Sequence, residues 1–151
     1  MTDEEQPAMF GNVVAHGLDV VDMADFSRLM NKQAGGFLDR YFTAGELVSA
    51  NGGGNRIERL ASRFAIKEAV LKALGTGWGD GIAFTDVEVV SQRGGAPTVM
   101  LHRRLVVIAG EQGIVSWLVS ASHTAAVAMA SVIALSSQTG AGGKSIGGSS
   151  M

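Results

Sequence analysis

The spacing of apolar residues changes along the chain, and each change predicts a different secondary structure. The segment from Val13 to Val21 is rich in β-branched residues, which favours a strand. The next segment has apolar side chains at helical spacing, at Met23, Phe26, Leu29 and Met30. Asp22 can cap this helix, and Gly35 and Gly36 are expected to end it.

Two further helices are predicted in the first half of the chain. Thr43 and Glu46 have the spacing of a capping box, so a short helix should begin there and end near the glycine cluster that follows. A long helix should run from Arg56 to about Leu74, because this segment contains neither Gly nor Pro and has many strong helix formers. Asn55 can cap its start and Gly75 its end.

The second half of the chain returns to strand patterns. Residues 82–92 show partial alternation, residues 93–96 read as a turn, and residues 97–102 read as the antiparallel return strand. Residues 103–113 are ambiguous. A short helix is favoured there, because Gly113 can end it and the preceding strand needs a connection.

The last two apolar segments, 115–123 and 125–135, predict a hairpin that turns at His123 and Thr124. Most of the predicted strands are adjacent in sequence, whereas the helices are inserted early. This order indicates an α+β fold, built mainly on antiparallel sheet packed with a long central helix, rather than a doubly wound sheet.

The composition suggests one domain with polar extensions at both ends. Residues 13–135 are expected to form the single folded domain, and residues 1–12 a flexible leader. Residues 136–151 are rich in Gly and Ser. They cannot bury enough apolar surface to offset the entropy of ordering, so this tail is expected to be disordered.

Composition and charge exclude several classes of function. The formal net charge of the 151 residues is -2, which argues against nucleic acid as a partner, because nucleic-acid-binding domains are usually distinctly basic. The sequence has no cysteine, which excludes thiol nucleophiles and Cys-rich zinc sites and favours the cytoplasm. No apolar run reaches the roughly 18 residues of a membrane span, and the acidic start lacks the pattern of a signal peptide.

The predicted long helix carries charges within an apolar stretch and then enters the loop GTGWGDG. Buried helices avoid charges that have no partner, so these charges need an explanation. Glu68 and Lys72 lie one turn apart and could form an ordinary exposed ion pair, while Arg63 and Lys67 lie one turn apart on another side. Alternatively, the glycines let backbone N–H groups converge on an anion. Lysines would then supply the positive charge, because the loop meets the negative end of the helix dipole.

Asp19 is a carboxylate within the first apolar strand. It could be a turn or cap residue at the end of that strand. Together with Glu68 it could instead hold one hard cation. Magnesium suits best, because it takes one or two protein carboxylates and completes its shell with water and phosphate, whereas zinc would favour His or Cys. His123 could be a general base, a phosphate contact or a surface histidine.

Four motifs follow one another along the chain: GLDVV near the start, FTAGE from Phe42, RFAIKEAVLKALGTG from Arg63, and SASHT around His123. In this order and at these separations they resemble the holo-acyl-carrier-protein synthases, the bacterial 4'-phosphopantetheinyl transferases. The resemblance extends from about Val13 to Leu135, and the third motif is the most specific.

The resemblance implies an enzyme that transfers 4'-phosphopantetheine from coenzyme A to a serine of apo acyl carrier protein, in support of fatty acid biosynthesis. By similarity, Asp19 and Glu68 bind Mg²⁺ and Lys72 contacts the phosphates. The residues expected near coenzyme A are Arg63, Lys72, Gly75, Gly77, Gly95, Pro97 and His123. The family is typically a homotrimer with active sites between protomers, and the turn at Gly95 and Pro97 is expected to approach the adenine across a subunit boundary.

One region departs from the family's pattern. The helix after the first motif usually presents basic residues to the acidic carrier protein, whereas this chain has Asp25 where arginine is expected. Arg28, Lys32 and Arg40 could compensate. The sequence also leaves the general base open between Glu68 and a water on the metal, with His123 less favoured.

Two alternatives from other classes stay open. The first is a non-catalytic module that binds coenzyme A or a nucleotide and regulates a partner, for which Asp25 is the best support. The second is a structural trimer in which the charged helix is incidental.

Overall fold

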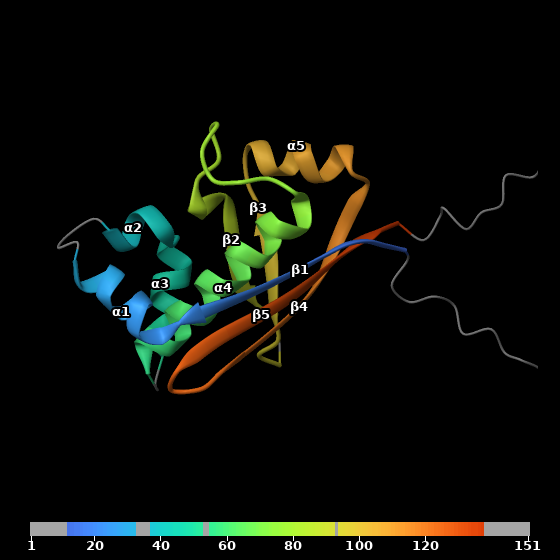
Figure 1. Ribbon diagram of the computed structural model, residues 1–151. Coiled ribbons are helices and arrows are strands. Elements are labelled where there is room, and N and C mark those ends of the chain that lie inside the picture. The colour runs from blue at the N-terminus through green and yellow to red at the C-terminus, as the bar shows by residue number, and fades with distance from the viewer. Residues whose placement is uncertain (1–11, 33–36, 53–54, 93, 138–151) are drawn as a thin grey trace, which may run out of the picture.

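Two antiparallel sheets pack around one long helix in the computed structural model, which describes residues 12–32, 37–52, 55–92 and 94–137 (Figure 1). In chain order the elements are β1 (Val13–Asp22), α1 (Met23–Asn31), α2 (Phe37–Tyr41), α3 (Ala44–Ala50), α4 (Arg56–Leu74), the 3-10 helix η1 (Phe84–Asp86), β2 (Val87–Ser91), β3 (Pro97–Leu101), α5 (Arg104–Glu111), β4 (Ile114–His123) and β5 (Val127–Ser136). This arrangement confirms the α+β fold expected from the sequence.

The larger sheet has the strand order β1-β5-β4, so the first and last strands of the fold are neighbours. The backbone N–H of Ser136 donates to the carbonyl of Asn12 at 2.8 Å where β5 ends and β1 begins. Strands β4 and β5 form the predicted hairpin, and the hydroxyl of Thr124 accepts hydrogen bonds in its turn. The second sheet is the β2–β3 hairpin, which lies beside β4 and α4.

Helix α4 lies against one face of the larger sheet and supplies much of the core (Figure 1). It spans Arg56–Leu74, the range that the sequence predicts. The Asn55 side chain accepts hydrogen bonds from the N–H groups of Ile57 and Glu58, which satisfies donors that have no partner inside the helix. Gly75 ends the helix at φ 72°, a left-handed conformation that favours glycine. Both end signals read from the sequence are therefore confirmed.

Two local elements differ from the sequence-based expectation. The sequence predicts a strand from residue 82, but Phe84–Asp86 form η1 and β2 begins only at Val87. The Asp86 side chain accepts a hydrogen bond from Ala83 N–H at 2.9 Å, and this local bond favours a turn over a strand. Helix α2 was not expected, because five residues are too few to show a helical period.

A buried ion pair joins α3 to α4. The side chains of Glu46 and Lys67 are both 0% exposed, and Lys67 Nζ lies 2.8 Å from Glu46 Oε1. Backbone groups complete their hydrogen bonding, namely the carbonyls of Phe84 and Val87 for Lys67 and the N–H groups of Thr43 and Val89 for Glu46. Burial lowers the pKa of Lys67, and the Glu46 carboxylate opposes this shift. Lys67 is thus a structural residue of the core, whereas the sequence pattern placed it only one turn from Arg63.

Strand β1 approaches α4 very closely at Gly17. A Cβ on Gly17 would overlap the carbonyl oxygen of Ala69 and would lie 2.8 Å from its carbonyl carbon and 3.1 Å from the nitrogen of Ala73. These are backbone atoms within a helix, so they cannot move aside as a flexible side chain can. Any larger residue at this position must push β1 away from α4.

We expect Gly17→Ala to lower the free energy of unfolding by about 3 kcal/mol, because overpacking a close contact strains the core. Gly110→Ala is the matched control, since a Cβ on this residue of α5 would meet no atom within 4 Å. It should leave stability unchanged or raise it by up to about 1 kcal/mol. Urea unfolding measures both values, and wild-type stability of Gly17→Ala would contradict the close approach.

Several expectations lie outside the described residues. They concern residues 1–11 of the predicted leader, Gly35 and Gly36, and residues 138–151 of the predicted tail. Strand β5 extends to Ser136, one residue beyond the boundary expected from composition. No helix in the described part of the chain is long and apolar enough to cross a membrane.

Candidate active site

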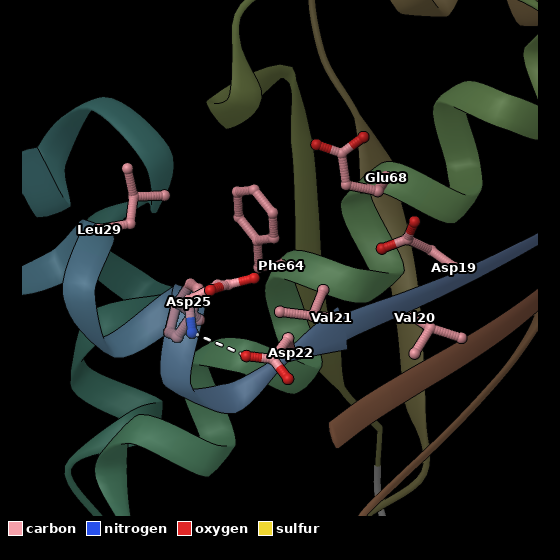
Figure 2. A pocket seen from close by; sticks show the side chains of 9 residues that line it. Asp19, Val20, Val21, Asp22, Asp25, Leu29, Phe64 and Glu68 are labelled. Carbon is pink, nitrogen blue, oxygen red and sulfur yellow. Dashed lines mark hydrogen bonds between the residues drawn. The ribbon is translucent and has the colours of Figure 1, made fainter. Parts of the chain in front are cut away.

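A pocket of about 300 Å³ opens between β1, α1 and α4 (Figure 2). Its acidic lining consists of Asp19, Asp22, Asp25 and Glu68, and its apolar wall includes Phe26, Leu29 and Phe64. The pocket therefore contains both carboxylates that the sequence analysis assigned to a shared cation. Figure 2 shows their side chains close together, one on β1 and the other on α4.

The periodicities of β1 and α4 explain why Asp19 and Glu68 meet. Side chains alternate along a strand, so Asp19 lies on the same face of β1 as the buried residues Gly17 and Val21, toward α4. On α4, Phe64 and Glu68 are one turn apart and line the same side of the helix. The close packing of β1 on α4 then brings the two carboxylates to one pocket.

Lys72 pairs across to β1. Its Nζ lies 3.0 Å from Asp19 Oδ1 and 3.1 Å from the carbonyl oxygen of Leu18. The sequence left open an ordinary pair of Lys72 with Glu68 along the helix, but the recorded hydrogen-bond partners of Lys72 are on β1 instead. The Lys72 side chain is 55% exposed, so this ion pair contributes only about 0–1 kcal/mol and Lys72 can turn toward an anion at little cost.

Glu68 is held by a residue that the sequence analysis did not assign to the site. Trp78 Nε1 donates a hydrogen bond of 3.0 Å to Glu68 Oε1. Burial raises the pKa of Glu68, the hydrogen bond from Trp78 opposes this shift, and the charge of Asp19 adds to it. The electrostatic repulsion between the carboxylates of Asp19 and Glu68 agrees with their position in one pocket. The sequence signal that could have identified Trp78 is its place as the one aromatic residue of the loop GTGWGDG.

A second pocket of about 190 Å³ lies between α4 and the β2–β3 hairpin. It contains three of the residues expected near coenzyme A: Arg63, Gly95 and Pro97. Burial lowers the pKa of the Arg63 guanidinium. Its Nε is buried without a hydrogen-bond partner in the described residues, although the other guanidinium nitrogens donate to Ser49 and to the carbonyl of Arg59. An unpaired buried donor beside a pocket is suited to an anionic ligand.

The two pockets lie on different sides of α4. Arg63 and Glu68 are five positions apart, which separates them by about 140° around the helix. The structure therefore brings Asp19, Glu68 and Lys72 together in one place, and Arg63, Gly95 and Pro97 together in another.

The remaining expected residues line neither pocket. His123 ends β4, and its Nε2 lies 3.2 Å from Glu58 Oε2 in the first turn of α4. Gly75 and Gly77 follow the end of α4, near Lys72. The sequence analysis did not anticipate Glu58 as the partner of His123.

Asp25, the acidic residue found where arginine was expected, forms an exposed ion pair with Arg28 on α1. Arg28 is therefore partly neutralised by the residue for which it was expected to compensate. Lys32 and Arg40 are both exposed, after α1 and in α2 respectively.

Comparison with known proteins identifies the family and the fold. Residues 15–130 match the model of the 4'-phosphopantetheinyl transferase superfamily. The chain belongs to this family. The resemblance read from the four motifs is confirmed, and so is the expectation of a transferase.

Individual relatives of the chain agree with this family assignment. The chain is 38% identical over 121 residues to the holo-[acyl-carrier-protein] synthase of Solibacter usitatus, covering 80% of this chain and 97% of the relative. It is 40% identical over 123 residues to the same enzyme of Streptomyces avermitilis, covering 82% and 98%.

Solved structures show the same architecture. The holo-[acyl-carrier-protein] synthase of Neisseria meningitidis matches with a TM-score of 0.74 at 31% identity, covering 82% of this chain and 98% of that chain. The enzyme of Helicobacter pylori, solved in complex with coenzyme A, matches with a TM-score of 0.68 at 28% identity, covering 79% and 98%.

Proposed function

We propose that this protein transfers 4'-phosphopantetheine from coenzyme A to a serine of an apo acyl carrier protein, with Mg²⁺ held by Asp19 and Glu68. The observation that carries the proposal is the meeting of these two carboxylates in one pocket of a chain that belongs to the phosphopantetheinyl transferase family. The names of its relatives support the same substrates. A cytoplasmic location and a role in fatty acid biosynthesis remain predictions from the sequence.

The donor set of the first pocket fits magnesium. Asp19 and Glu68 offer hard oxygen ligands, and no group of three or more His, Cys, Asp or Glu residues that could hold a metal occurs among the described residues. A site with only two protein carboxylates suits an ion that retains water and takes phosphate oxygens. When bound, magnesium supplies positive charge that offsets the negative charge developing on the pyrophosphate.

The side chains around this site match the needs of phosphoryl transfer. In the overall reaction the serine oxygen bonds to the phosphorus that carries the pantetheine arm, the bond from that phosphorus to the bridging oxygen breaks, and adenosine 3',5'-bisphosphate leaves. Lys72 is exposed and beside Asp19, so its ammonium can move onto a phosphate oxygen. Glu68 is a candidate acceptor for the serine proton through a bridging water. Its place in the pocket favours it over His123, which pairs with Glu58 outside it.

The separation of the two pockets supports a site shared between protomers. Asp19 and Glu68 on one side of α4, and Arg63 and Pro97 on another, would serve one coenzyme A molecule if two chains each contributed one half. The face of the larger sheet that points away from α4 exposes apolar side chains that a second chain could cover, among them Leu18 at 49% and Val20 at 55%. We therefore keep the homotrimer as the proposed assembly.

The proposal is tested by incubating the protein with coenzyme A, Mg²⁺ and an apo acyl carrier protein and weighing the carrier by intact mass spectrometry. We expect a mass gain equal to one phosphopantetheine, lost with a chelator and restored by added Mg²⁺. Binding of coenzyme A without any mass gain on several carriers would favour the non-catalytic module instead. Asp25 in the wall of the pocket is the feature that keeps this second candidate open, because it adds negative charge where an acidic carrier would approach.

A further inference from the structure

We propose that Trp78 is a positioning residue for Glu68, and that the glycine-rich loop after α4 holds it in place. The inference rests on the proposed function, because it concerns a carboxylate assigned to magnesium. The observation behind it is the hydrogen bond of 3.0 Å from Trp78 Nε1 to Glu68 Oε1.

The loop after α4 reverses the chain so that Trp78 lies back against the helix. Gly79 has φ 98°, a conformation that L side chains rarely adopt, and its backbone forms an isolated antiparallel bridge with Ile82. The turn that precedes Trp78 is at Gly75, at φ 72°, and it returns the indole to the level of Glu68, about two turns before the loop. This path explains Gly75 and Gly79 without requiring them to form an anion site.

The indole ring is fixed on its apolar side as well. Trp78 stacks on Phe84, with ring centroids 3.6 Å apart and an interplanar angle of 27°. Phe84 in turn stacks on Phe64, with centroids 5.5 Å apart, and Phe64 lines the pocket one turn before Glu68. The aromatic contacts therefore restrict the direction in which the indole N–H can point.

The outer part of the loop is held by two consecutive arginines that precede and begin α5. Arg103 donates to the carbonyl of Gly81, and Arg104 donates to the carbonyl of Asp80. Arg103 also lies 3.4 Å from the buried carboxylate of Asp86, which caps η1. The loop is thus tied to the elements that follow it and does not depend on Trp78 alone.

The chemistry of an indole suits this role. Its N–H can only donate, so Trp78 can hold one carboxylate oxygen but cannot compete with that carboxylate as a ligand for a cation. No hydrogen-bond partner is recorded for Glu68 Oε2 in the described part of the chain, which leaves this oxygen for the ion. Removing the hydrogen-bond partner of a metal-binding carboxylate typically weakens metal binding by about 10-fold to 100-fold.

The test uses the two tryptophans of the chain. Trp78→Phe keeps a ring for stacking but removes the N–H, and Trp117→Phe is the matched control, because Trp117 lies on β4 and lines a different pocket. Mn²⁺ binding is measured by electron paramagnetic resonance, with and without coenzyme A. We expect the dissociation constant for Mn²⁺ to rise about 10-fold in Trp78→Phe and to stay unchanged in Trp117→Phe.

Steady-state kinetics provide a second measurement, whose expected result differs from that of a purely structural role for Trp78. In Trp78→Phe the Mg²⁺ concentration for half-maximal turnover should rise about 10-fold, while the KM for coenzyme A and kcat at saturating Mg²⁺ stay close to the wild-type values. A lower Tm with reduced kcat at every Mg²⁺ concentration, and unchanged Mn²⁺ affinity, would overturn the proposal and leave Trp78 a packing residue.

Failure of this inference can be told apart from failure of the proposed function. If Glu68→Gln weakens Mn²⁺ binding but Trp78→Phe does not, the role of Trp78 is wrong and the metal site stands. If neither Asp19→Asn nor Glu68→Gln changes Mn²⁺ affinity, both proposals are wrong. Fluorescence locates the ion independently: bound Mn²⁺ should quench Trp78 emission in Trp117→Phe and leave Trp117 emission in Trp78→Phe unaltered.

Discussion

Glu68→Gln is expected to lower kcat/KM for holo-carrier formation at least about 1,000-fold, equivalent to about 4 kcal/mol of lost transition-state stabilisation. The amide preserves the size of the side chain but removes the charge that would hold magnesium. The fold should remain intact, because burial already disfavours the ionised form of Glu68 and its recorded hydrogen bond is to Trp78. Asp19→Asn should act in the same way, and steady-state kinetics with circular dichroism measures both effects.

Glu88→Gln is the control for removing a carboxylate outside the pocket. Hydrogen bonds from Thr43 and His102 lower the pKa of Glu88, so its ionised form stabilises the fold above the unfolded-state pKa of about 4.3, and this contribution is lost as the pH falls through the folded value. Glu88→Gln should therefore reduce stability at neutral pH while turnover is retained. A loss of turnover equal to that of Glu68→Gln would contradict a specific role for the pocket carboxylates.

Lys67→Met is expected to destabilise the protein by about 3–5 kcal/mol, the largest effect on stability that we predict. Methionine fills a similar volume but leaves Glu46 fully buried without its cationic partner. The carbonyls of Phe84 and Val87 also lose a donor. Urea or thermal unfolding provides the measurement.

The double variant Lys67→Met with Glu46→Gln tests whether the unpaired charge is responsible. It should recover part of the stability lost in Lys67→Met, because the carboxylate is then absent. A loss of stability in the double variant equal to the sum of the losses in Lys67→Met and Glu46→Gln would contradict a coupled buried pair. Wild-type stability in Lys67→Met would contradict it as well.

Local signals in the sequence predicted most of the elements. The caps at Asn55 and Gly75 set the bounds of α4, and the capping box of Thr43 and Glu46 located α3. Such signals act over a few residues, so they can be read directly from the chain. The failure at residues 82–86 is also local in origin, because the capping bond of Asp86 outweighed the strand pattern.

The site could be predicted only in part, because its partners come from distant segments. The pattern identified Asp19 and Glu68 as carboxylates that could share one cation, and the family resemblance implied the same pair. Periodicity alone could not show that Lys72 turns to Asp19, nor that Lys67 lies in the core with Glu46, because both contacts depend on how β1, α3 and β2 pack on α4. Glu46 also had a sufficient local explanation as a cap, which concealed its second role.

Trp78 illustrates the same limit. The loop GTGWGDG is visible in the sequence, but its path back to Glu68 depends on the backbone at Gly75 and on stacking with Phe84. A glycine-rich loop in isolation suggests an anion site, and only the fold reveals a hydrogen bond to a carboxylate.

The most direct test of the central claim is the position of the metal ion in a crystal grown with coenzyme A and Mn²⁺, located by anomalous scattering. We predict one peak ligated by the carboxylates of Asp19 and Glu68 and by the pyrophosphate, with the adenine end of the coenzyme against Arg63 and Pro97 of a neighbouring protomer. A peak that is absent from this pocket, or ligated by neither carboxylate while coenzyme A is bound, would contradict the account.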